Sequence, residues 1–82
     1  MIYPYKDKFP QIDPTAFIAD YATITGDVTI GAETSVWFNT VIRGDVSATI
    51  IGKRVSIQDL SCLHQSPAYP LIIEDEVTIG HQ

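Results

Sequence analysis

The sequence of 82 residues is poor in cysteine, in cations and in long apolar runs. Its single cysteine, Cys62, cannot form an intrachain disulfide, which agrees with a reducing compartment. Ten acidic residues outnumber five basic ones, and the net charge of −5 argues against nucleic acid or an anionic membrane as a partner. No apolar run approaches the roughly 18 residues of a membrane span, and residues 1–8 do not resemble a signal peptide. We therefore expect a cytoplasmic protein.

An aliphatic residue occurs at every sixth position in the first half of the chain. The series is Ile12, Ile18, Ile24, Ile30, Val36 and Ile42. Four positions after each of them comes a small or β-branched residue, and these are Ala16, Ala22, Val28, Thr34, Thr40 and Val46. A step of two between inward-facing residues matches strand alternation, and a step of four marks a corner. An α-helix would need a period near 3.6, so the pattern indicates a β-solenoid.

Three six-residue steps would make a triangular coil of about 18 residues, with successive coils roughly 4.8 Å apart and hydrogen-bonded to each other. Each residue should then lie beneath the residue 18 positions later. The expected stacked pairs are Ile12 with Ile30, Ile18 with Val36, and Ile24 with Ile42. Corners of this kind favour residues that tolerate positive φ, and the candidates are Gly26, Asp27, Gly31 and Asn39.

Two interruptions delay the six-residue period. Residues 43–50 postpone the next aliphatic to Ile51, and residues 65–70 carry two prolines that predict a protruding loop, because proline cannot donate to a strand ladder. The period returns near Ile73 and stops in mid-repeat at Gln82. We expect an N-terminal lead-in segment at 1–11 and a β-helix domain of about four coils at 12–82. The last coils and the cap that a solenoid needs are missing from this pattern, so we expect a chain truncated at its C-terminus.

Aromatic residues at two places suggest contacts outside the repeat. Residues 1–11 have no periodicity and should lie over the end of the solenoid, where Phe9 is a candidate plug. Trp37 and Phe38 follow the inward Val36, so at least one of the two rings should face outward. An outward ring could mark a subunit contact, or it could lie over a neighbouring coil.

The phase of the repeat also predicts which histidines face outward. His64 follows the inward Leu63 by one position and His81 follows the inward Ile79 by two, so neither is expected in the core. A catalytic zinc ion usually takes three protein ligands and a water. Two histidines on separate faces could meet at a metal site between subunits. Cys62 alternates onto the side of His64 and offers a second candidate pair. The alternative is that both histidines are ordinary surface residues.

Four more polar residues are predicted to point outward. Arg43 and Asp45 are two positions apart, so on a strand they face the same way and can form an ion pair or reach across an interface. Gln58 and Asp59 follow the inward Ile57, where an acid could hold a guanidinium or orient a ligand histidine. The alternative for each residue is a solvated polar corner.

Four segments, in this order and spacing, resemble the γ-class carbonic anhydrase-like family of hexapeptide-repeat proteins. They are Val41-Ile42-Arg43-Gly44-Asp45, Ser56-Ile57-Gln58-Asp59, Leu63-His64-Gln65 and Val77-Thr78-Ile79-Gly80-His81-Gln82. The likeness runs from about Tyr5 onward. It implies a left-handed parallel β-helix, an exception to the right-handed crossover rule. It also implies a homotrimer with a metal ion at each subunit interface, zinc or another divalent metal such as iron or cobalt.

The resemblance implies a role for each matched residue. His64 corresponds to the first metal ligand of the family, and His81 corresponds to the second, which comes from the neighbouring subunit. Gln58 would position the nucleophile or the substrate. The implied reaction is the reversible hydration of carbon dioxide to bicarbonate by a metal-activated water. The residues that match the polar surroundings of the site are Arg43, Asp45, Gln58 and Asp59.

The chain departs from the family pattern at three points. The family's third ligand is a histidine five residues beyond the second, which would lie past Gln82. Ser56 stands where many members have asparagine, and residues 65–70 contain no glutamate, where active members carry an acidic proton shuttle. We therefore expect weak zinc binding by two histidines and weak or absent activity in this chain.

Two other functions fit a solenoid of this kind. A hexapeptide acyltransferase also uses a left-handed β-helix trimer, but it needs a catalytic histidine in a loop and a coenzyme A groove from C-terminal coils. A non-catalytic trimeric scaffold or binding module would hold metal only incidentally. A titration with acetyl-coenzyme A would distinguish an acyltransferase from a carbonic anhydrase-like enzyme. The metal content of the purified protein, together with its oligomeric mass, would distinguish a non-catalytic scaffold from that enzyme.

Overall fold

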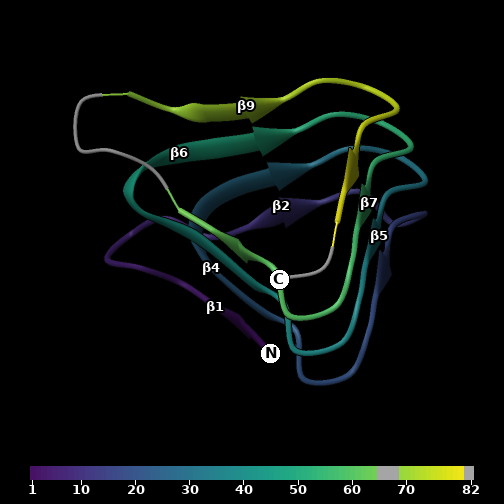
Figure 1. Ribbon diagram of the computed structural model, residues 1–82. Helices are drawn as coiled ribbons and strands as arrows, with labels where there is room; N and C mark the ends of the chain where they lie inside the picture. Colours follow the sequence, from purple (N-terminus) through teal and green to yellow (C-terminus); the bar gives the residue numbers. More distant parts are fainter. Residues whose placement is uncertain (65–68, 81–82) are drawn as a thin grey trace.

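A computed structural model describes residues 1–64 and 69–80, and in these ranges the chain is a solenoid of short strands without helices. This part of the chain therefore contains no helix long and apolar enough to cross a membrane. The strands pair in parallel, and Figure 1 shows the coils stacked about one axis. The fold is the left-handed parallel β-helix that the sequence predicts. Its strands are β1 (Ile2–Tyr3), β2 (Gln11–Ile12), β3 (Phe17–Ile18), β4 (Thr23–Ile30), β5 (Ser35–Val36), β6 (Val41–Ile51), β7 (Ser56–Ile57), β8 (Cys62–Leu63), β9 (Leu71–Ile73) and β10 (Thr78–Ile79).

The solenoid has three faces because β4 and β6 each bend around a corner and belong to two of them. The first face contains β1, β8 and the first halves of β4 and β6. The second face contains β2, β9 and the second halves of β4 and β6. The third face is formed by β3, β5, β7 and β10. Each turn of the chain visits the three faces in this order.

The register between coils confirms the predicted stacking of aliphatic residues. Ile12 pairs with Ile30, Ile18 pairs with Val36, and Ile24 pairs with Ile42. Ile24, Val36 and Ile42 are completely buried, so the predicted inward positions form the core. The buried side chains of successive coils form one hydrophobic cluster, which lets short strands bury apolar area continuously.

Buried threonines at the small inward positions form hydrogen bonds to the backbone of the next coil at the corners. Thr34 donates a hydrogen bond from its hydroxyl to the carbonyl of Gly52 (2.8 Å), and Thr40 donates one to the carbonyl of Gln58 (2.9 Å). Both acceptors lie 18 residues further along the chain. Burying a hydroxyl without a partner is costly, so these bonds explain why threonine is tolerated at core positions.

Positive φ angles recur at equivalent corner positions of successive coils. Gly26 (83°) and Asn39 (59°) adopt them as predicted, whereas Asp27 and Gly31 do not. Most of the residues in this conformation are not glycine, and they fall into two columns that the sequence pattern did not reveal. The columns are Tyr21, Asn39 and Leu60 at one corner and Glu33, Arg54 and Glu76 at another.

The prediction that Val46 faces inward is wrong. The register slips between Gly26 and Val28, so Val28 pairs with Thr49 rather than with Val46. Thr49 is completely buried, and 43% of Val46 is exposed. Val46 therefore belongs to a bulge of β6 at the corner between the first and second faces, because residues added at that corner push the inward position back to Thr49.

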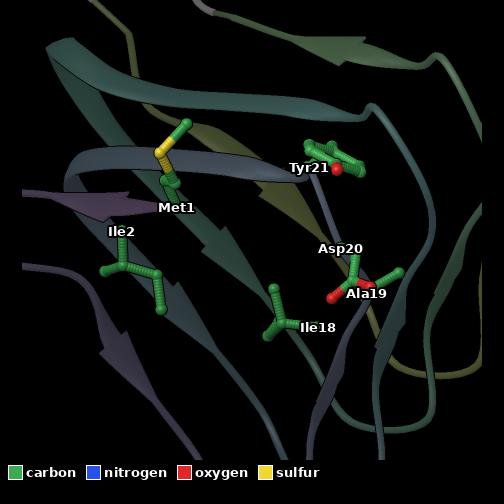
Figure 2. A pocket seen from close by; sticks show the side chains of 6 residues that line it. All are labelled: Met1, Ile2, Ile18, Ala19, Asp20 and Tyr21. Carbon is green, nitrogen blue, oxygen red and sulfur yellow. The ribbon is translucent and has the colours of Figure 1, made fainter.

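The prediction that Phe9 plugs the N-terminal end is also wrong, since 62% of this residue is exposed. The chain begins instead with β1, whose Ile2 pairs with Ile24. The amino group of Met1 donates a hydrogen bond to the carbonyl of Ala22 and extends this ladder. A pocket of about 630 Å³ lies at this N-terminal end of the solenoid, and Figure 2 shows the side chains that line it.

Candidate functional site

Arg43 and Asp45 form the ion pair that their spacing predicts. Both lie on β6 at the end of the first face. Arg43 donates from Nη2 to Oδ2 of Asp45 (2.6 Å) and from Nε to Oδ1 (3.2 Å), so the contact is bidentate. The hydrogen bonds from Arg43 lower the pKa of the Asp45 carboxyl, and the same bonds raise the pKa of Arg43. The side chain of Arg43 is 40% exposed and that of Asp45 is 18% exposed, so the pair is presented at the surface.

Gly44 between them is required by close backbone packing. A Cβ atom at this position would lie 2.4 Å from the carbonyl oxygen of Asp27 in the coil below. Real Cβ atoms essentially never approach another atom so closely, so only glycine fits here without displacing the coil. The Arg-Gly-Asp order therefore reflects the geometry of stacked corners.

His64 lies on the first face next to the column that contains Arg43. Val41 pairs with Cys62 and Ile42 pairs with Leu63, so continuing the register by one residue sets His64 beside Arg43. His64 is exposed, as predicted from the phase of the repeat. Cys62 is exposed on β8, two residues before His64.

Gln58 and Asp59 occupy the corner that leads from the third face into β8. Both are half-buried. The carbonyl of Gln58 accepts hydrogen bonds from the hydroxyls of Thr40 (2.9 Å) and Ser61 (2.8 Å). The six-residue pattern placed Thr40 in the core without identifying it as a support of this corner. The presence of hydroxyl-bearing residues at small inward positions is the sequence signal that could have predicted these hydrogen bonds to the corner.

The structure brings only part of the predicted site together. Arg43, Asp45 and His64 share the first face, while Gln58 and Asp59 lie at its preceding corner. His81 lies outside the described residues. Within the described ranges, no group of three or more histidine, cysteine, aspartate or glutamate side chains could hold a metal ion. An exposed imidazole can still bind a metal whose other ligands come from a second subunit, so the donor chemistry of His64 fits a shared site.

The chain is similar over its full length to several curated proteins. It is 76% identical over 82 residues to a protein of Geobacillus kaustophilus named carbonic anhydrase, and it covers 45% of that protein. It is 71% identical over 82 residues to YtoA, an uncharacterized transferase of Bacillus subtilis, and covers 48% of it. It is 43% identical over 81 residues to the mitochondrial gamma carbonic anhydrase 1 of Arabidopsis thaliana, of which it covers 30%. No protein-family profile matches the chain.

Crystal structures with this fold include those of two bacterial proteins. One is a Bacillus cereus protein with a provisional acetyltransferase name, at 72% identity and a TM-score of 0.98, and the chain covers 48% of it. The other is a hexapeptide transferase family protein of Anaplasma phagocytophilum, at 37% identity and a TM-score of 0.70, and the chain covers 47% of it. The chain thus spans about half the length of several relatives. With these likenesses and its hexapeptide-repeat fold, the chain is similar to the γ-class carbonic anhydrase-like group of hexapeptide-repeat proteins.

Proposed function

We propose that this chain is the part of a γ-carbonic anhydrase-like protein that carries one side of a metal site for the reversible hydration of carbon dioxide to bicarbonate. The observation that carries the proposal is the position of His64. Its imidazole is exposed on the first face, one strand along from the fixed Arg43–Asp45 ion pair. The names of the Geobacillus and Arabidopsis relatives support this reaction over other metal chemistry.

In this proposal the metal ion is shared between subunits. His64 of one subunit and His81 of a neighbour would hold it, and zinc is the first candidate, with iron or cobalt as alternatives. When bound, such an ion would lower the pKa of a coordinated water to about 7. A homotrimer would create three equivalent sites.

The chain's own polar residues would orient the reacting groups and the subunits. Gln58 is suited to positioning substrate because its backbone carbonyl is held by two hydroxyls, those of Thr40 and Ser61. The bidentate contact keeps Asp45 ionised and orients the guanidinium of Arg43. We assign this pair to the subunit contact beside the metal, and Asp59 to orienting groups from the corner next to Gln58.

Zinc uptake and oligomeric mass together test this proposal. Equilibrium dialysis against zinc should show saturable binding that approaches one ion per subunit, and light scattering should give a trimer. The substitutions His64→Ala and His81→Ala, which remove the chain's two histidines, should each abolish the uptake. Cys62→Ser is the matched control beside His64 and should retain it. Uptake that survives both histidine variants would overturn the shared site, and uptake lost in Cys62→Ser would assign the metal to a Cys62–His64 pair.

An acyltransferase-like function is the second candidate. It is favoured by the names of two relatives, the Bacillus cereus protein with a provisional acetyltransferase name and the hexapeptide transferase family protein of Anaplasma phagocytophilum. A calorimetric titration with acetyl-coenzyme A separates the two candidates. Saturable binding of acetyl-coenzyme A by a zinc-free protein would favour the transferase, whereas zinc uptake without such binding would favour the carbonic anhydrase-like function.

A further inference from the structure

One corner of the solenoid differs from the other two in the length of its connections. The links from the second to the third face are residues 13–16, 31–34, 52–55 and 74–77, and each has four residues. The links from the third to the first face are residues 19–22, 37–40 and 58–61, again four each. Between the first and second faces, seven residues (4–10) join β1 to β2, and β6 carries the bulge that includes Val46. In repeat proteins, insertions gathered on one side often mark a binding surface.

The long connections at this corner line an open cleft of about 530 Å³. The tight turn from Tyr5 to Lys8 forms one wall, closed by two backbone hydrogen bonds of 2.9 Å between these residues. The bulge of β6 around Val46 and Ala48 forms the opposite wall, and Pro70 lines the cleft as well. In Figure 1 the bends of β4 and β6 and the link from β1 to β2 lie along the same edge of the solenoid. This volume falls in the range of small-molecule sites, which is roughly 300–1,000 Å³.

The cleft presents charges of both signs beside an apolar wall. Lys6 and Lys8 line it, and they are two of the five cations of an acidic chain. Asp7 and Asp27 line it too, while the third carboxylate, Asp45, is bound to Arg43. The ring of Tyr5, the exposed side chain of Val46, Ala48 and Pro70 supply the apolar surface. A ligand with one charge would face repulsion from one of these two pairs of charges.

We propose that this cleft binds a small zwitterion with an apolar side chain, of the α-amino acid class. Its carboxylate would face Lys6 and Lys8, its ammonium group would face Asp7 and Asp27, and its side chain would lie against Val46 and Tyr5. The cleft opens at the corner beyond Asp45, so the ligand would lie beside the candidate metal site without supplying a ligand to it. The inference is independent of the proposed carbon dioxide chemistry, because none of the six contacting residues has a role in that reaction.

Nuclear magnetic resonance titrations of the ¹⁵N-labelled chain with leucine test this inference. Saturable shifts should appear in the amides of residues 5–8 and 44–48. Three probes at equal ionic strength each lack one part of leucine: 4-methylpentanoate lacks the ammonium group, isoamylamine lacks the carboxylate, and glycine lacks the apolar side chain. Each should bind at least about tenfold more weakly, because a lost charge-assisted hydrogen bond or buried side chain is worth 1.5 kcal/mol or more.

The double variant Lys6→Ala/Lys8→Ala should weaken leucine binding by at least about tenfold. Asp27→Asn independently tests the contact with the ammonium group and should also weaken leucine binding. Lys53→Ala is the matched control, because Lys53 is an exposed lysine at a corner without insertions. The proposal is overturned if leucine causes no saturable shifts, if 4-methylpentanoate or isoamylamine binds as well as leucine, or if Lys53→Ala weakens binding as much as the double variant.

Discussion

The hydroxyl of Thr40 donates a hydrogen bond of 2.9 Å to the backbone carbonyl of Gln58 in the next coil. Thr40 is completely buried, whereas Gln58 is half-buried at the corner that carries candidate site residues. Ser61 donates a second hydrogen bond to the same carbonyl (2.8 Å). The core of the solenoid therefore sets the position of this corner directly, through side chains that occupy the small inward positions of the repeat.

The substitution Thr40→Val should lower the free energy of unfolding by about 1 kcal/mol, because valine keeps the shape of threonine but removes the donor. The carbonyl of Gln58 would still accept from Ser61, so the loss should stay at this modest size. Urea denaturation followed by circular dichroism measures the difference. Thr29→Val, at an exposed position of β4, is the control and should change stability by less than about 0.5 kcal/mol. Equal effects of the two substitutions would show that the Thr40 hydrogen bond contributes nothing.

The substitution Gly44→Ala should destabilise the fold by roughly 2 kcal/mol or more, because its Cβ would meet the backbone of Asp27 and force two coils apart. Gly80→Ala is the matched control, since a Cβ there has no neighbour within 4 Å among the described residues. The control should stay within about 0.5 kcal/mol of the parent chain. Thermal denaturation of both variants provides the comparison, and a Gly44→Ala chain as stable as Gly80→Ala would disprove the close approach of the coils.

The stability of the fold should fall in acid through the titration of Asp45. Arg43 lowers the pKa of this carboxyl in the folded chain below its value in the unfolded chain. The ionised carboxylate therefore stabilises the fold at pH values above the ordinary aspartate pKa of about 3.9, and this contribution is lost as the pH falls through the lower folded value. Urea midpoints measured between pH 7 and pH 2 should decrease over that lower range.

Asp45→Asn should flatten this part of the pH profile, because asparagine does not titrate. Arg43→Gln should also flatten it, since the pKa of Asp45 then returns toward its ordinary value. The double variant should be no flatter than Asp45→Asn alone, because both changes remove one interaction. An unchanged acid profile in Asp45→Asn would assign the pH dependence to other carboxylates, such as Asp13, whose pKa is lowered by hydrogen bonds from Thr15.

The substitution Phe38→Ser should weaken self-association if the outward aromatic rings form a subunit contact. Phe38 is 43% exposed, and its ring centroid lies 6.1 Å from that of Trp37, which lies 5.1 Å from that of Phe17. Three adjoining rings give an apolar surface suited to burial in an interface. Sedimentation velocity should show a shift toward monomer in Phe38→Ser. Phe9→Ser removes another exposed ring, 62% accessible, and should leave the distribution unchanged; a shift in both variants would indicate a general loss of apolar surface instead.

The corner between Ile42 and Thr49 shows which part of the fold the sequence pattern predicted and which part it did not. The stacking of Ile24 on Ile42 follows from a six-residue period, because each hexad supplies one strand and one corner. The inward position after Ile42 was assigned to Val46, where the structure has Thr49. A local pattern does not say how many residues a corner absorbs before the next strand begins. Only the pairing of Val28 with Thr49 across two coils resolves that number.

The same distinction between local pattern and inter-coil register applies to the candidate site. Periodicity alone determined that His64 faces outward and that Arg43 and Asp45 point the same way, since alternation on a strand is a local property. The tertiary structure decided that His64 lies beside the Arg43 column and that Thr40 supports Gln58, because both relations depend on the register between coils. It also gathered the long connections at one corner, which no single repeat reveals. The sequence by itself thus determined the solenoid and its outward side chains, and the stacking of coils decided which of those side chains become neighbours, because inter-coil register depends on the length of every corner in between.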